Sequence, residues 1–134
     1  MPDSIFTRLY RGELPCVKVY EDPRVFAFMD AGQVNPGHVN EASIEPCETL
    51  VDADEATAVA MMAAAHRIAR AVQAAFAPAG MTILQANKAA GWQTVPHLHL
   101  HVLPRHANDG VELTWPRKDP GIAVLKELAA RIRL

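Results

Sequence analysis

Cysteine is scarce in this 134-residue sequence, which has only Cys16 and Cys47. The two do not form a Cys-x-x-Cys pair, so the sequence gives no sign of a disulfide scaffold, a zinc knuckle or a redox pair. We therefore expect two free thiols, which are typical of a reducing compartment. The N-terminal stretch MPDSIFTRLYRGELP lacks the apolar segment of a secretory signal. Together these features predict a cytoplasmic protein.

Long hydrophobic runs and an excess of one charge are also missing. The most apolar stretch, residues 56–65, is mostly alanine and far shorter than the ~20 residues of a membrane span. Thirteen basic and fifteen acidic residues give a net charge of −2. This balance excludes the basic face that polymeric nucleic acid requires, but it allows a mononucleotide, which needs only a few donors. A composition that is 50% hydrophobic and 21% charged predicts one globular domain over residues 1–134.

Side-chain periodicity and turn residues predict elements in the order β-β-β-α-β-β-α. This order is typical of an α+β domain built on an antiparallel sheet. The long helix is expected from Asp52, with Glu55 as its capping-box partner, to about Phe76, and a last helix is expected after Asp119-Pro120. The predicted strands cover residues 17–20, 24–29, 39–44, 81–86 and 95–103.

Three of the six histidines lie at alternate positions of one predicted strand, as His97, His99 and His101. Alternation puts these imidazoles on one face, and it puts Leu98 and Leu100 on the other, toward a core. One interpretation is a metal site with His38 as a further ligand. Three residues along a straight strand converge poorly on one ion, however, and no acidic residue flanks them. The other interpretation is nucleophilic catalysis, in which an imidazole attacks phosphorus and its neighbours bind the phosphate oxygens.

The residues before the histidine row favour phosphate chemistry. The Gln93 amide, the Thr94 hydroxyl and the backbone N–H groups of the turn at Gly91 are all donors. Such donors can offset the negative charge that develops on a phosphate, so no metal is needed.

The motif His97-Leu98-His99-Leu100-His101-Val102-Leu103 resembles the signature of the histidine triad (HIT) family. Further matches include Phe26-Ala27-Phe28-Met29-Asp30 and Asn35-Pro36-Gly37-His38, and the resemblance covers about residues 4–106. It implies a five-stranded antiparallel sheet with two helices, paired as a homodimer. The C-terminal segment 107–134 lies beyond it.

The resemblance also implies an enzyme, a metal-independent nucleotide hydrolase or transferase that uses no cofactor. His99 would attack the α-phosphate of a purine nucleoside phosphoramidate or dinucleoside polyphosphate, forming a nucleotidyl-histidine that water then hydrolyses. His97 and His101 would orient His99 and bind phosphate oxygens. The other catalytic residues that the resemblance implies are His38, Gln93 and Thr94. An alternative function is a nucleotide-binding scaffold with residual activity and a role in protein interaction.

The remaining matched positions would bind the nucleotide. Asp30 matches the carboxylate that binds the ribose hydroxyls, and Asn87 matches a polar position near the sugar or phosphate. The apolar positions around the base are Ile5, Phe6, Phe28 and Met29. His66 and His106 receive no role.

The sequence departs from the family pattern at three places. Asn40 and Glu41 stand where the family has apolar residues of a central strand, so we expect that strand to be bent or its inward face to be rearranged. Trp92 stands between Gly91 and Gln93, where many members have glycine directly before glutamine. The N-terminal cysteines of zinc-carrying members are missing, so no structural zinc is expected.

Overall fold

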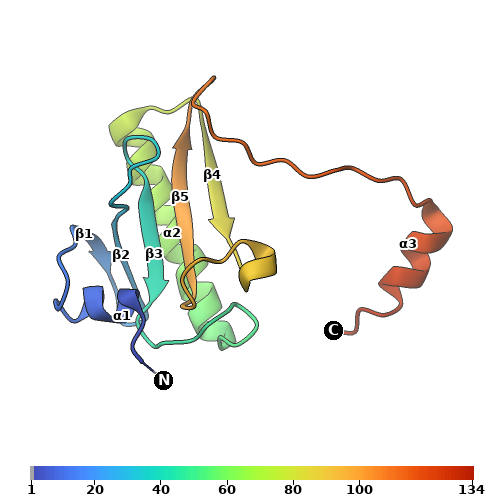
Figure 1. The fold of residues 1–134 in the computed structure, drawn as a ribbon, viewed down its shortest axis with the longest axis horizontal. Helices are drawn as coiled ribbons and strands as arrows, with labels where there is room; N and C mark the ends of the chain where they lie inside the picture. Colours follow the sequence, from blue (N-terminus) through green and yellow to red (C-terminus); the bar gives the residue numbers. More distant parts are fainter. Residues whose placement is uncertain (1) are drawn as a thin grey trace.

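The computed structural model describes residues 2–134 and contains one five-stranded antiparallel sheet (Figure 1). The order across the sheet is β1-β2-β3-β5-β4, so β5 lies between β3 and β4. This confirms the expected α+β domain. The strands are β1 (Lys18–Glu21), β2 (Val25–Met29), β3 (Val39–Ser43), β4 (Gly80–Gln85) and β5 (His99–Arg105). The helices are α1 (Ile5–Tyr10), α2 (Glu55–Phe76) and α3 (Ile122–Ala129), with a short 3-10 turn, η1 (Ala89–Gly91).

Helix α2 begins two residues later than the sequence predicted. The Asp54 side chain caps it by accepting from the Thr57 N–H, whereas the Asp52 carboxylate accepts from the Thr49 backbone and hydroxyl in the preceding turn. The expected end is correct, because the helix stops at Phe76 and Ala77 adopts a left-handed conformation.

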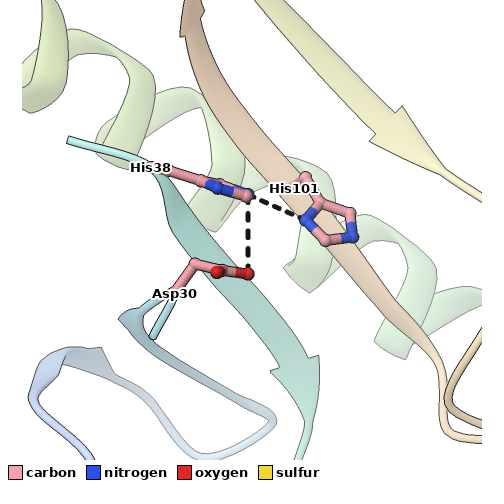
Figure 2. Close-up of side chains that lie close together, drawn as sticks. All are labelled: Asp30, His38 and His101. Atoms are coloured by element: carbon pink, nitrogen blue, oxygen red, sulfur yellow. Dashed lines mark hydrogen bonds and ion pairs between the residues drawn. The ribbon is translucent and has the colours of Figure 1, made fainter. Parts of the chain in front are cut away.

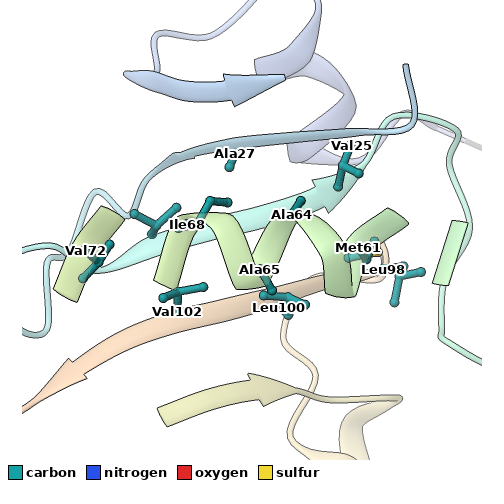
Figure 3. Close-up of a cluster of buried hydrophobic side chains, with 11 residues drawn as sticks. Val25, Ala27, Met61, Ala64, Ala65, Ile68, Val72, Leu98, Leu100 and Val102 are labelled. Atoms are coloured by element: carbon teal, nitrogen blue, oxygen red, sulfur yellow. The ribbon is translucent and has the colours of Figure 1, made fainter. Parts of the chain in front are cut away.

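Helix α2 covers one face of the sheet, where the main core lies (Figures 1 and 3). Met61, Ala65, Ile68 and Val72 are buried on one side of α2, and alternate residues of β2 and β5 pack against them. Full burial of a valine, leucine, isoleucine or methionine side chain stabilises the folded state by about 1.5–3 kcal/mol. The cluster comprises Val25, Ala27, Val39, Met61, Ala64, Ala65, Ile68, Val72, Leu98, Leu100 and Val102. No helix within residues 2–134 is both long and apolar enough to cross a membrane.

The opposite face of the sheet carries the short helix α1, which the sequence analysis did not predict. Six residues are too few to show a helical period, although the Ser4 side chain caps the helix by accepting from the Thr7 N–H. Phe6 of α1 packs with Phe26 and Phe28 of β2 in a second buried cluster. The histidines of β5 share this face.

Strand β3 is regular despite its polar residues, which corrects the expectation of a bend. It pairs in continuous register with β2 and with β5, and all five of its residues are buried. Glu41 is fully buried on the α2 face, and neither of its carboxyl oxygens has a hydrogen-bond partner among residues 2–134. Burial, followed by the charge of Asp22, raises the pKa of Glu41 to about 8. The strand therefore accommodates the carboxyl group in its neutral form.

The turn before β3 requires glycine at position 37. Gly37 has a φ of +98°, and a Cβ atom there would lie only 2.7 Å from the Phe76 ring at the end of α2. The same turn is held from inside by Gln33, whose amide donates to the carbonyls of Asp30 and His38. These contacts fix the position of His38.

The C-terminal segment leaves the sheet and ends in α3, away from the rest of the chain (Figure 1). None of the α3 residues is buried. Its large exposed apolar side chains, together with two that follow it, are Ile122, Val124, Leu125, Leu128, Ile132 and Leu134.

Candidate active site

His99 opens β5 and is oriented by the backbone two residues before it. Its Nδ1 lies 2.6 Å from the His97 carbonyl oxygen, which can only accept, so Nδ1 carries the proton and Nε2 has the free lone pair. Burial lowers the pKa of His99, although the hydrogen bond to His97 opposes this shift. The ring of Phe6 packs edge-on against it, with 4.7 Å between the centroids. His99 is therefore a neutral, oriented imidazole, as a nucleophile must be.

His97 lies in the bend before β5, and both of its ring nitrogens have hydrogen-bond partners within the protein. Nε2 donates to the Ser43 carbonyl over 2.7 Å, so Nδ1 must accept from the Ser4 hydroxyl. With 1% of its surface exposed, the ring has no means of binding phosphate oxygens, which differs from the sequence-based expectation. Its carbonyl orients His99, and its side chain ties α1 to the end of β3.

His38, directly before β3, and His101 of β5 approach each other, and Asp30 lies beside them (Figure 2). His38 Nε2 is 2.9 Å from His101 Nδ1 and 3.7 Å from an Asp30 carboxylate oxygen. Burial, followed by the neighbouring His99 and His38 rings, lowers the pKa of His101 to about 4. Burial also lowers the pKa of His38, which the Asp30 charge partly opposes. Both rings are thus neutral at pH 7, and one donates to the other.

The Asp30 carboxylate is held by two donors. The Gly32 backbone N–H donates to Oδ1 over 2.7 Å, and the Asn40 amide donates to Oδ2 over 2.8 Å. Burial alone would raise the pKa of Asp30, but these two hydrogen bonds and the nearby histidines lower it overall. Asp30 is therefore an ionised acceptor at neutral pH.

Asp30, His38 and His101 also have the donor atoms of a metal site. One ligand atom from each lies within 4.8 Å of the other two. Two imidazole nitrogens and a carboxylate oxygen are ligands that zinc accepts. No acid lies beside the histidines in the sequence, because Asp30 reaches them only through the pairing of β2, β3 and β5.

An apolar cavity of about 480 Å³ opens next to these side chains. It is lined by four of the residues predicted to bind the nucleotide, namely Ile5, Phe28, Met29 and Asp30. Phe6 lies between the cavity wall and the histidines, with its ring centroid 5.5 Å from that of Phe28. A mostly apolar lining with a few polar groups is typical of a small-molecule site.

The loop before β5 holds the other predicted polar residues, and the structure uses two of them internally. Gln93 is buried, and its amide accepts from the Lys88 N–H and donates to the Glu48 carbonyl. Asn87 accepts from the Leu50 N–H and exchanges hydrogen bonds with Gln85. Through these bonds Gln93 and Asn87 support the loop, and their contacts with a nucleotide stay a prediction. Thr94 is exposed.

Three polar residues of this region were not predicted as site residues: Ser4, Ser43 and Asn40. Ser4 meets His97 across 93 positions of sequence, which no local pattern reveals. Asn40 stood out only as a polar residue in an apolar strand. For these three residues, that polar position in β3 was the one sign in the sequence of a site residue.

The comparison with known families matches the HIT domain model over residues 11–108. This chain belongs to the HIT family. It is 35% identical to "Protein hit" of Bacillus subtilis over 114 residues, which is 84% of this chain and 79% of the relative. The crystal structure of SMU.412c from Streptococcus mutans superposes with a TM-score of 0.91 at 33% identity, covering 98% of this chain and 83% of that one.

Two other HIT relatives are named for an activity. Adenylylsulfatase HINT3 of Arabidopsis thaliana is 30% identical over 80% of this chain, which spans 54% of that longer protein. Adenosine 5'-monophosphoramidase hnt1 of Schizosaccharomyces pombe is 25% identical over 84% of this chain and 82% of its own length. The HIT family thus includes hydrolases of nucleotide compounds.

Proposed function

We propose that this HIT protein is a nucleotidyl hydrolase or transferase that acts through a nucleotidyl-histidine on His99. The observation that carries the proposal is the hydrogen bond from His99 Nδ1 to the His97 carbonyl. It leaves Nε2 as the nitrogen able to attack phosphorus. Phe6, which packs against His99, also packs against Phe28 in the lining of the cavity that includes Asp30. The substrates are purine nucleoside phosphoramidates or dinucleoside polyphosphates. The activities named for the two relatives above support this substrate class.

The reaction has two displacements at one phosphorus atom. His99 Nε2 forms a bond to the α-phosphorus while the bond to the leaving nitrogen or oxygen breaks, and the leaving group keeps that electron pair and takes a proton from water. The nucleotidylated imidazole is cationic, which strengthens its Nδ1–H···O bond to His97. Water then attacks the same phosphorus, the P–Nε2 bond breaks with its electron pair kept by Nε2, and His99 returns to its neutral form. The attacking water passes a proton to the hydroxide that the first step left. In this reaction Thr94 and His101 would donate to the phosphate oxygens.

The test is to trap the intermediate. After rapid mixing with adenosine phosphoramidate and an acid-free quench, we expect a mass shift of one adenylyl group on the peptide that contains His99. His99→Asn should abolish the adduct and the turnover, whereas His66→Asn, on the exposed surface of α2, should keep both. Full turnover by the His99→Asn variant would rule out the mechanism. Tight binding of AMP without any adduct or turnover would favour the scaffold role instead.

The proposed reaction is independent of metal, and this part of the proposal needs its own measurement. We expect EDTA to leave turnover unchanged, since no step of the proposed reaction requires a cation. A loss of turnover that zinc restores would assign the Asp30, His38 and His101 donors to a catalytic metal instead.

We also propose that the protein is a homodimer in the cytoplasm. An isolated helix of eight residues is marginal in water, so α3 needs a surface to pack against. Its own domain buries none of it, and a second copy offers a partner. Light scattering should report a dimer that Leu125→Glu dissociates and that the control Lys126→Glu leaves intact.

The two free thiols, Cys16 and Cys47, suit a reducing compartment.

A further inference from the structure

Asn40 lies at the centre of the site, on the β3 face that carries the histidines. Its cross-strand neighbours are Phe28 on β2 and His101 on β5, so it stands between the cavity that would hold the base and the histidines that would face the phosphate. Only 6% of its surface is exposed. A sugar that joins the base to the phosphate would pass over this position.

The orientation of the Asn40 amide is set by its neighbour. Asp30 is an ionised carboxylate and can only accept, so the amide nitrogen must face it, at 2.8 Å. The amide oxygen then points away from Asp30, and it is buried with no hydrogen-bond partner among residues 2–134. A buried carbonyl without a donor destabilises the fold, and an apolar side chain of the same size would avoid that loss. An apolar side chain could not make the hydrogen bond to Asp30, which only the amide provides.

This contact decides which way the Asp30 carboxylate faces. Each of its oxygens takes one N–H, from Gly32 on Oδ1 and from Asn40 on Oδ2. A carboxylate oxygen has two acceptor positions, so one remains free on each. Two adjacent free acceptors on a fixed plane match the two hydroxyls of a vicinal diol. Without the Asn40 donor, Oδ2 is free to turn toward His38, whose Nε2 is already 3.7 Å away.

We propose that Asn40 is a positioning residue that holds Asp30 as a two-point acceptor and so makes the site select ribonucleotides over 2'-deoxyribonucleotides. The inference rests on the proposed function, in which Asp30 binds the ribose. Asn40 acts through Asp30 and touches no reacting atom. Its effect therefore falls on nucleoside binding rather than on the chemical step.

The test compares AMP with 2'-deoxy-AMP by calorimetry, which does not depend on turnover. The native protein should bind AMP about tenfold or more tightly than 2'-deoxy-AMP, because one hydrogen bond to a charged acceptor is lost with the 2'-hydroxyl. Asn40→Leu, which has nearly the same shape, should reduce this preference to about twofold or less. With adenosine phosphoramidate as substrate, the same variant should raise KM while kcat stays within about threefold.

The stability of the variant separates positioning from a merely structural role. Since Asn40→Leu removes the unpartnered oxygen, its melting temperature should equal or exceed that of the native protein even though nucleotide selection is lost. Glu41→Leu is the matched control, because it removes the adjacent polar residue of β3 from the opposite face and should leave the AMP preference unchanged. Asn40→Ala serves the same comparison if the leucine variant does not fold.

Three results would overturn the inference: equal binding of both nucleotides by the native protein, binding of neither, or an unchanged preference in the leucine and alanine variants. The proposed function fails separately, through the absence of an adduct on His99. A protein that selects AMP through Asn40 but forms no adduct would retain this inference and lose that mechanism.

Discussion

The buried carboxyl group of Glu41 makes the stability of this protein fall as the pH rises. In the unfolded chain Glu41 has its ordinary pKa of 4.5, and in the folded chain the pKa is about 8. Above pH 4.5 the unfolded state therefore releases a proton that the folded state keeps until about pH 8. Over this window the free energy of unfolding decreases by about 1.4 kcal/mol per pH unit, and the full effect is on the order of 5 kcal/mol. Below pH 4.5 both states are protonated and the effect vanishes.

The perturbation that isolates this effect is Glu41→Gln, which keeps the shape and removes the titration. At pH 7 the variant should be more stable than the native protein by about 3 kcal/mol, and at pH 4.5 the two should be equal. Urea denaturation followed by circular dichroism, at half-unit steps from pH 4.5 to 8.5, measures the difference. Other titrating groups cancel in that difference, because both proteins share them.

The control and the refutation use the same measurement. For Glu112→Gln, in the exposed segment before α3, the free energy of unfolding should differ from that of the native protein by the same amount at every pH. If the difference in free energy of unfolding between Glu41→Gln and the native protein is also independent of pH, then Glu41 is not a neutral buried acid and the reasoning is wrong. Part of the shift comes from Asp22, so Asp22→Asn should move the midpoint of the effect to lower pH.

Three further predictions concern the active site and its supports. Burial lowers the pKa of His99, so kcat/KM should stay constant as the pH falls from 8 to the ordinary histidine value of 6.5, and a decline that begins above pH 6.5 would contradict the assignment. Ser4→Ala removes both the cap of α1 and the donor to His97, so thermal unfolding should show a loss of about 1–3 kcal/mol, and Ser4→Thr should restore most of it. Trp92 has a φ of +78°, so Trp92→Gly should stabilise the loop by about 1 kcal/mol, and a destabilised variant would mean that the indole makes a compensating contact.

The histidine face could be predicted from sequence because alternation along a strand is a local rule. Leu98 and Leu100 do pack against α2, and His99 and His101 do point away from it. The same rule could not place Asp30 beside His101, because that contact depends on β5 inserting between β3 and β4. Strand order is a global property, which side-chain periodicity does not encode.

Two contacts that the sequence did not reveal have equally physical causes. Gln93, predicted to donate to phosphate, also closes its loop, because its amide bonds to the backbone of Lys88 and Glu48. Asp52 was expected to cap α2, but two acids two residues apart compete for that role, and Asp54 takes it. In each case the residue type was suited to the predicted task and also to a neighbouring one. A sequence pattern does not decide between two such partners.

The contact between Gly37 and the Phe76 ring links parts of the molecule that no strand pairing connects. Gly37 directly precedes His38, and Phe76 is the last residue of α2, on the far side of the sheet. When the last turn of α2 opens, the turn that carries His38 loses the ring on which it rests, so the two open as one cooperative unit. Amide deuterium exchange at His38, whose N–H donates to the Asn35 carbonyl, should therefore follow the exchange of the last α2 turn. Substitutions on the surface of that turn would then change the lifetime of the assembled active site without touching any residue in it.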